Sequence, residues 1–267
     1  MSSSPTSRPL ILGASGRLGQ ALARAWPADA PAPVLQTRRG AGGTLAWDIL
    51  AEPAPAAGLS AIGGIVALAG VTRGDAAALA ANTPLARAAV DLGARLGVPV
   101  LVASSQAVYG AQAGLLREDA PLTPVGEYGR AKAAMEAAVT GPHVTHLRIG
   151  NVAGCDALAD AIARGPVTLH RFADGRGPAR AMIGPADLAR VLLALLAAPA
   201  RPAVLNVARP GLVAMADVLA AAGVPFGWRA APQGTLQALA LDVTSLQGIC
   251  PLPPGDAAAM ARQGGYA

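Results

Sequence analysis

Three polar side chains in the middle of the chain could exchange a proton with a substrate oxygen. Tyr128 and Lys132 stand four residues apart, so in a helix they lie on one face. A tyrosine with a pKa near ~10 is a poor base at neutral pH, and a cation close by lowers that pKa. Ser105 can hold the same oxygen by a hydrogen bond. These residue types favour hydride transfer at a hydroxyl or carbonyl carbon, with Tyr128 moving the proton.

A run of glycines near the N-terminus could hold the cofactor for such a reaction. Gly13, Gly16 and Gly19 follow an apolar run over 10–12 and precede a helical repeat of apolar residues. Gly13 permits a sharp turn, Gly16 lets backbone approach a pyrophosphate, and Gly19 lets the helix pack against the sheet. No Lys-Ser or Lys-Thr follows, so this is not a P-loop. A tight strand-to-helix turn without a ligand is the alternative.

The end of the next apolar run, 33–37, bears on which cofactor is bound. An acidic residue at this place usually binds the ribose 2′-hydroxyl of NAD. The chain instead has Thr37, Arg38 and Arg39 there. Because an arginine can hold a 2′-phosphate, we expect NADP, with NAD as the alternative. Two solvated arginines in a loop would look the same.

Further apolar runs predict strands at 44–47, 63–69, 99–102 and 144–149. Helical patterns separate them, the longest running from Asn82 to Leu96 and from Glu127 to Val139. Strands and helices that alternate in this way predict an α/β fold with a doubly wound parallel sheet. Ligands bind beyond the carboxyl ends of such strands, where Gly70, Ser105 and Asn151 are expected.

Composition excludes several classes of protein. Hydrophobic residues make up 53% of the 267 residues and aromatic residues 3%, which is enough for a sizeable core of small aliphatic side chains. The net charge of +5 comes from dispersed arginines, so we expect no nucleic acid as partner. Cys155 and Cys250 make no disulfide framework, and no apolar stretch is long enough to span a membrane, so we expect a cytoplasmic protein.

The chain divides into three parts by pattern. Residues 1–8 are expected to form a disordered tail, 9–153 the dinucleotide-binding core, and 154–267 a smaller substrate-binding portion interleaved with the last core strands. In this last portion we expect helices over 156–164, 188–198 and 215–222 and strands over 168–172 and 204–207. Asp187 is expected to cap the second of these helices.

Three segments together resemble the short-chain dehydrogenase/reductase superfamily: Gly-Ala-Ser-Gly-Arg-Leu-Gly at 13–19, Ala-Ser-Ser-Gln-Ala-Val-Tyr-Gly at 103–110 and Tyr-Gly-Arg-Ala-Lys at 128–132. Leu-Arg-Ile-Gly-Asn-Val at 147–152 and Arg180 with Asp187-Leu188-Ala189 look like its extended branch, the NAD-dependent epimerase/dehydratase family. That family acts mostly on nucleotide sugars. The resemblance implies a Rossmann-type fold.

The resemblance also assigns expected roles to residues of this chain. The catalytic group would be Ser105, Tyr128, Lys132 and Asn82, the last helping to position the lysine. The substrate would contact Ser105, Gln106, Asn151 and Arg180. Cofactor contacts are expected from Gly13, Ser15, Gly16, Arg17, Leu18, Gly19, Arg38, Asp48, Ile49, Leu68, Ala69, Gly70, Tyr128 and Lys132.

The resemblance therefore implies an NAD(P)-dependent enzyme, either an epimerase or a reductase, and the sequence leaves both open. A dehydratase is less favoured, because Gln106 and Ala107 stand where dehydratases of this family place acids. A nucleotide sugar and a smaller carbonyl compound both remain as substrates. The rival functions are a non-catalytic NADP-binding sensor and a structural module without cofactor. Because members of the family commonly form homodimers, the resemblance implies a homodimer through helices 85–96 and 128–139.

Overall fold

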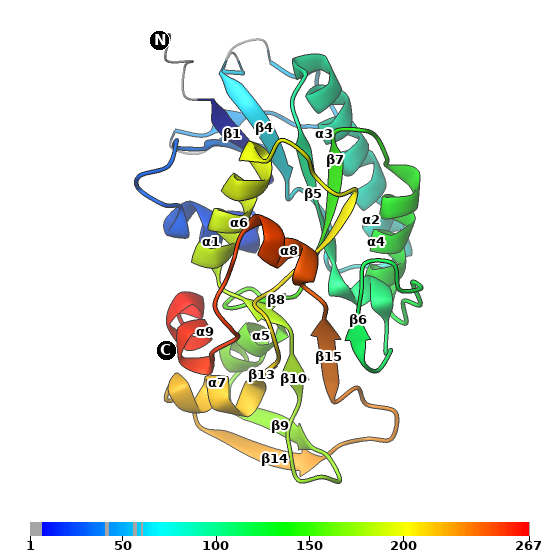
Figure 1. The fold of residues 1–267 in the computed structure, drawn as a ribbon, viewed down its shortest axis with the longest axis vertical. Coiled ribbons are helices and arrows are strands. Elements are labelled where there is room, and N and C mark those ends of the chain that lie inside the picture. The colour runs from blue at the N-terminus through cyan, green and yellow to red at the C-terminus, as the bar shows by residue number, and fades with distance from the viewer. Residues whose placement is uncertain (1–6, 41–42, 56–57, 60, 267) are drawn as a thin grey trace.

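The computed structural model describes residues 7–40, 43–55, 58–59 and 61–266. Seven parallel strands form the main sheet, in the order β12-β7-β5-β4-β1-β2-β3 (Figure 1). The order steps outward from β1 in both directions, as in a doubly wound sheet, which confirms the predicted fold class. The strands are β1 (Arg8–Leu12), β2 (Val34–Thr37), β3 (Leu45–Ala46), β4 (Ile62–Ala67), β5 (Val100–Ser105), β7 (Val144–Ile149) and β12 (Val204–Val207).

Apolar side chains on both faces of this sheet make two cores. Ile11 on β1 and Leu101 on β5 point to one face, and their neighbours Leu10 and Val100 point to the other. Successive side chains of a strand alternate between faces, so a strand covered on both sides must be apolar throughout. Such buried, two-faced strands require helices on each side.

The helices supply these two layers. Helices α1, α6 and α8 pack on one face, and α3 and α4 on the other, with the short α2 beside α4 (Figure 1). None of the helices in the described ranges is long and apolar enough to cross a membrane. The helices are α1 (Arg17–Ala25), α2 (Ala76–Ala80), α3 (Asn82–Leu96), α4 (Glu127–Ala138), α5 (Ala157–Ala163), α6 (Pro185–Ala197), α7 (Met215–Ala221), α8 (Thr244–Ile249) and α9 (Ala257–Gly264), with a 3-10 turn η1 (Gln106–Tyr109).

A smaller part below the main sheet has its own core, built from α5, α7, α9 and short strands (Figure 1). β9 and β14 pair with each other in parallel, and β8 pairs with β11. The remaining short strands form a sheet in the order β13-β10-β15-β6. These strands are β6 (Leu115–Leu116), β8 (Asn151–Val152), β9 (Val167–Arg171), β10 (Ala179–Arg180), β11 (Met182–Ile183), β13 (Val213–Ala214), β14 (Phe226–Ala230) and β15 (Ala238–Leu241).

Two local predictions are wrong. Arg8 was expected in a disordered tail but begins β1, where it pairs with Ile62; residues 1–6 lie outside the described part of the chain. Asp187 does not cap a helix, because α6 begins at Pro185 and its N-cap is Gly184. The Asp187 side chain is 4% exposed and accepts hydrogen bonds from Arg209 and Gln263, so its carboxylate is held in a buried ion pair.

Candidate active site

The glycine turn between β1 and α1 is built as the sequence predicts, with one difference. Gly13 has a φ of +84°, and a Cβ there would lie 2.6 Å from the Ala69 Cα. Gly16 is exposed, and a Cβ there would meet only the Gly13 carbonyl, at 3.3 Å. A Cβ at Gly19 would lie 2.6 Å from the Ala14 Cα, so Gly19 brings α1 against the turn itself rather than against the sheet. The turn therefore leaves open space beside Gly16.

That space is a cavity of about 490 Å³ at the carboxyl ends of β1, β2 and β4. Nine of the residues expected to bind cofactor line it: Gly13, Ser15, Gly16, Arg38, Asp48, Ile49, Leu68, Ala69 and Gly70. Thr37 and Arg39, noted in the sequence beside Arg38, line it too. The sequence did not single out the other lining residues, which are Gln36, Gly40, Trp47, Val71 and Leu85. A groove beside an exposed helix N-terminus fits the pyrophosphate and adenosine of a dinucleotide.

Five other residues expected at the cofactor do not line this cavity: Arg17, Leu18, Gly19, Tyr128 and Lys132. Gly19 is buried under the turn. The Arg17 guanidinium instead pairs with Asp160 of α5 at 2.6 Å, and Arg73 pairs with the same carboxylate. This ion cluster links the glycine turn to the smaller part of the fold.

Gln36 holds the turn in place from the neighbouring strand. Its Oε1 accepts a hydrogen bond from the Gly13 backbone N–H at 2.8 Å, and its backbone carbonyl accepts one from Ala14 at 2.9 Å. Its Nε2 donates to the Trp47 carbonyl. A glutamine inside an apolar strand gave no signal of this role in the sequence, because the role depends on the pairing of β1 with β2.

The charge at the rim of the cavity is positive. Arg38 has a side chain that is 71% exposed, and its Nε lies 3.7 Å from the Asp48 carboxylate. An exposed pair at that separation contributes little, about 0–1 kcal/mol, so Arg38 is available to an anion that reaches the rim. Arg39 is also exposed beside it.

Tyr128 and Ser105 come together beyond the carboxyl end of β5. Tyr128 lies in the first turn of α4, and Ser105 is the last residue of β5. Burial raises the pKa of the Tyr128 phenol, and a hydrogen bond with the Ser105 side chain lowers it in part. The Lys132 Nζ lies 5.9 Å from the centre of the Tyr128 ring. The three residues thus form one cluster, as the sequence predicts.

Lys132 is the only lysine in the chain. Its side chain is 5% exposed, and its Nζ donates a hydrogen bond to the Ala103 carbonyl at 2.8 Å. Burial lowers the pKa of Lys132 to about 8, although the negative charge of Glu136 opposes that shift. A buried amine that titrates near neutral pH is typical of functional sites.

Asn82 lies close to Lys132 but does not bond to it. Its carboxamide donates to the carbonyls of Val71 and Leu79 at 2.9 and 2.8 Å and accepts from the Val71 N–H at 3.3 Å. A Cβ at Gly70 would lie 2.6 Å from the Asn82 Oδ1 and 3.5 Å from the Lys132 Nζ. Asn82 therefore shapes the loop between β4 and α2 that faces the lysine.

A buried ion pair between Glu136 and Arg148 joins α4 to β7. The Arg148 guanidinium on β7 donates to the Glu136 carboxylate through Nε at 3.1 and 3.2 Å and through Nη2 at 2.8 Å. The Ser104 hydroxyl donates to the same carboxylate. Ser104 precedes Ser105, so this pair fixes the strand end and the helix that carry the candidate catalytic side chains.

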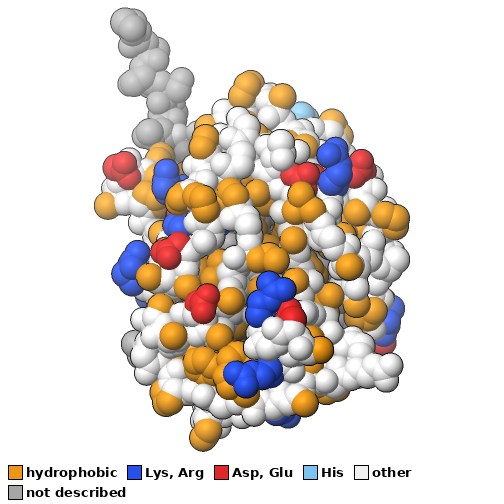
Figure 2. Space-filling view, turned by 60° about the horizontal axis from the view of Figure 1, so that its bottom comes forward, with side chains coloured by type: hydrophobic (Ala, Val, Ile, Leu, Met, Phe, Trp, Pro, Cys, Tyr) orange, Lys and Arg blue, Asp and Glu red, His pale blue; other side chains and the backbone are white. Residues whose placement is uncertain are grey.

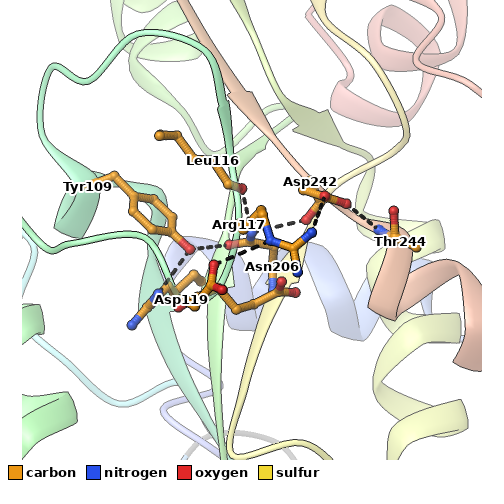
Figure 3. A network of polar contacts seen from close by, with 9 residues as sticks. Tyr109, Leu116, Arg117, Asp119, Asn206, Asp242 and Thr244 are labelled. Atoms are coloured by element: carbon orange, nitrogen blue, oxygen red, sulfur yellow. Dashed lines mark hydrogen bonds and ion pairs between the residues drawn. The ribbon is translucent and has the colours of Figure 1, made fainter.

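The same network fixes the 3-10 turn that follows Ser105. The Tyr109 hydroxyl donates to the Asn206 Oδ1 at 2.7 Å, and Arg148 donates to that hydroxyl at 3.0 Å. The Asn206 Nδ2 donates to the carbonyls of Leu116 and Asp242. Figure 3 shows Tyr109 pointing toward Asn206, with Asp242 beyond it. The turn η1 is thereby tied to β12 and to the segment after β15.

The residues expected to bind substrate lie at two places. Gln106 and Asn151 are in contact, since the Gln106 Nε2 donates to the Asn151 Oδ1 at 2.5 Å. Arg180 on β10 donates to the carbonyls of Ala179, Leu236 and Gln237 at 2.8 to 3.0 Å. Burial lowers the pKa of Arg180, and no carboxylate in the described part of the chain pairs with it.

A second cavity, of about 670 Å³, lies in the smaller part and was not predicted. The Arg171 guanidinium stacks 5.1 Å above the Trp228 ring at this cavity, and Arg229 and Phe172 also line it. Figure 2 brings this end forward and shows hydrophobic side chains next to Lys or Arg side chains. The rest of the lining is Ala173, Ala230, Ala231, Pro232, Gly234 and Thr235.

Comparison with known protein families gives one match. Residues 9–208 match the model of the family described as NAD dependent epimerase/dehydratase family. No sequence among the curated proteins matches the chain.

Many solved structures share the fold. One is MoeE5 in complex with UDP-glucuronic acid and NAD, with a TM-score of 0.76 and 22% identity over 97% of this chain and 98% of that one. A UDP-glucose 4-epimerase from Brucella ovis with NAD has a TM-score of 0.78 and 19% identity over 96% and 97%. The NDP-hexosamine 5,6-dehydratase TunA has a TM-score of 0.74 and 21% identity over 97% of each chain.

Proposed function

We propose that this chain oxidises and reduces a hydroxyl-bearing carbon of a nucleotide sugar. It belongs to the NAD dependent epimerase/dehydratase family and is an NAD-dependent enzyme. The residues that would hold the cofactor are those of the first cavity, with the pyrophosphate beside Gly16 at the start of α1. When bound, its nicotinamide supplies a hydride acceptor and donor. An epimerase would return the hydride to the same substrate, and a reductase would release oxidised cofactor after each turnover.

The observation that carries this proposal is the position of Lys132. Of the 21 basic residues counted as lysine or arginine, Lys132 is the one lysine, and it is buried beside Tyr128. An arginine would not serve in the same way, because the compact lysine ammonium has three rotatable donors, whereas the arginine guanidinium is a larger planar group.

Each residue of the cluster has a proposed role in moving the proton. Tyr128 takes the proton from the substrate hydroxyl and returns it. Ser105 donates a hydrogen bond to the phenolate, which lowers the pKa that burial raises. The positive charge of Lys132 stabilises the same phenolate. Its ammonium can also bond a ribose hydroxyl of the cofactor.

We favour NADP over NAD as the preferred cofactor. The end of β2 presents Thr37, Arg38 and Arg39 to the cavity, with no acidic side chain at that strand end to repel a 2′-phosphate. The Asp48 carboxylate pairs with Arg38 only at a long distance, 3.7 Å. The solved neighbours were obtained with NAD, which stays the alternative.

The nucleotide part of the substrate would lie over the smaller part of the fold. Arg180 is a half-buried cation without a pairing carboxylate among the described residues, which suits a diphosphate. The second cavity offers aromatic and arginine side chains, which suit a base. UDP-glucose and UDP-glucuronic acid are the ligands of solved neighbours and are the first compounds to test.

The test is a single turnover with the cofactor in place. Wild-type protein mixed with NADP⁺ or NAD⁺ and each nucleotide sugar should form reduced cofactor, and a sugar deuterated at the reacting carbon should pass its deuterium to that cofactor. Tyr128→Phe should bind cofactor as tightly as wild type and lose the reaction by about 10³-fold or more. Equal reaction in both proteins would refute the role of Tyr128. Cofactor binding without any reaction in either would favour a sensor.

The homodimer through α3 and α4 and the cytoplasmic location stay predictions. The boundary between the dinucleotide-binding core and the substrate-binding portion, between residues 153 and 154, also stays a prediction.

A further inference from the structure

The side-chain amide of Gln106 has one buried oxygen without a partner. Gln106 follows Ser105 directly and begins η1. The residue is 7% exposed, and its Nε2 donates to Asn151 at 2.5 Å. Its Oε1 is buried and accepts no hydrogen bond from any residue in the described ranges. A buried acceptor left unpaired is costly, so a donor from elsewhere would stabilise this arrangement.

The orientation of that amide is set by a carboxylate two contacts away. The Asp156 Oδ1 accepts hydrogen bonds from the Ala159 N–H and the Tyr266 hydroxyl, both at 3.1 Å. Its Oδ2 accepts from the Asn151 Nδ2 at 3.3 Å. Burial raises the pKa of Asp156, and these three donors oppose only part of that rise.

Asp156, Asn151 and Gln106 form a series of hydrogen-bonded side chains. Because a carboxylate can only accept hydrogen bonds, Asp156 fixes the direction of every bond in this series. Asn151 must turn its amide nitrogen to Asp156, so its oxygen faces Gln106. Gln106 must then turn its own nitrogen to Asn151, which leaves its oxygen on the other side. The exchange of oxygen and nitrogen in either amide would put two like groups in contact.

We infer that Asp156 is a positioning residue that holds the Gln106 oxygen ready to accept a hydrogen bond from a substrate hydroxyl or amide N–H next to the reacting carbon. This rests on the proposed function, because Gln106 directly follows Ser105, whose hydroxyl bonds the phenol of Tyr128 that exchanges the proton with the substrate. Sugars that present a carboxylate at that place are disfavoured, since a carboxylate offers no donor.

The isosteric variant Asp156→Asn reverses the series. Its amide oxygen can still accept from Ala159 and Tyr266, and asparagine caps a helix about as well as aspartate. Its nitrogen then faces Asn151, which must present its oxygen to that nitrogen. Asn151 then presents its nitrogen to Gln106, and the Gln106 oxygen is used up.

The double variant Asn151→Asp/Asp156→Asn restores the direction, because the carboxylate introduced at position 151 accepts hydrogen bonds from both neighbours. The total charge of the protein is unchanged in this double variant. Asp256→Asn is the matched control, since Asp256 caps α9 in the same way and lies outside the series.

The first readout does not depend on catalysis. In protein labelled with ¹⁵N in glutamine side chains, the Gln106 resonance is identified by its loss in Gln106→Glu. We expect its amide protons to exchange with water at least about tenfold faster in Asp156→Asn than in wild type, and to return to the slow rate in the double variant. Unchanged exchange in Asp156→Asn, or no recovery in the double variant, would overturn the positioning role.

The second readout is turnover of UDP-glucose. We expect Asp156→Asn to raise KM by about tenfold or more with kcat changed far less, because the bond is made before and during the reaction. Asp256→Asn should keep the wild-type KM. An unchanged KM in Asp156→Asn would overturn the substrate contact of Gln106. If wild type turns over no nucleotide sugar, the proposed function fails, while the amide exchange still decides the positioning role.

Discussion

The buried ammonium of Lys132 destabilises the fold, and removing it should make the protein more stable. The pKa of Lys132 falls from 10.5 to about 8 on folding. Each pKa unit corresponds to about 1.4 kcal/mol, so the unfolded chain binds this proton more favourably by roughly 3 kcal/mol at pH 7. This destabilisation of the folded state by Lys132 is complete at pH values below the folded-state pKa. It disappears as the pH rises through the pKa of the unfolded chain.

Lys132→Met keeps the length of the side chain and removes the charge. It also loses the hydrogen bond to the Ala103 carbonyl, worth about 1 kcal/mol. We therefore expect the cofactor-free variant to be about 2 kcal/mol more stable than wild type at pH 7. At pH 9.5 much of the lysine penalty has gone, and the difference should fall below about 1 kcal/mol.

Urea unfolding of both proteins at the two pH values measures this difference. Arg130→Met is the control, because Arg130 is on the same helix, is half-exposed and pairs with Glu127 at the surface. Its stability should depend on pH as that of wild type does. A Lys132→Met protein that is less stable at pH 7, or whose advantage is the same at both pH values, would refute the reasoning.

Three further predictions concern the cofactor cavity and its support. Gly16→Val should fold normally but lose at least about tenfold in NADPH affinity, because the valine side chain enters the cavity. Gly13→Ala should instead destabilise the fold, since φ is +84° there. Thermal unfolding distinguishes the two variants. Arg38→Ala should weaken NADPH about tenfold and leave NADH unchanged by calorimetry. Glu136→Gln should cost about 3–5 kcal/mol of unfolding free energy by leaving the Arg148 charge unpaired, and adding Arg148→Met should recover most of it.

The central sheet was predictable because its signal is local. Apolar runs such as 63–69 and 144–149 mark β4 and β7 to within one or two residues, and the glycines show where β1 ends. The cluster of Tyr128, Lys132 and Ser105 was predictable for a related reason. A spacing of four residues fixes the first two on a helix face, and a strand end fixes the third.

Other features depend on contacts that are distant in sequence. Asp187 is a residue type that often caps helices. Its buried carboxylate instead accepts hydrogen bonds from Arg209 and Gln263, which lie far along the chain. Gln36 lines the first cavity because β1 pairs with β2 in the register that sets Leu12 beside Gln36. The link between Gln106 and Tyr266 joins residues 160 positions apart through two side chains, which no local pattern contains.

The most direct test of the account is a titration of the purified wild-type protein with NADPH and with NADH. Trp47 lines the cofactor cavity, so energy transfer from its indole to the reduced nicotinamide cofactor gives the binding signal. We predict saturable binding of both cofactors, with NADPH the tighter, and NADPH binding at least about tenfold weaker in Gly16→Val. No binding of either cofactor would contradict the assignment of the cavity and of the active site beside it.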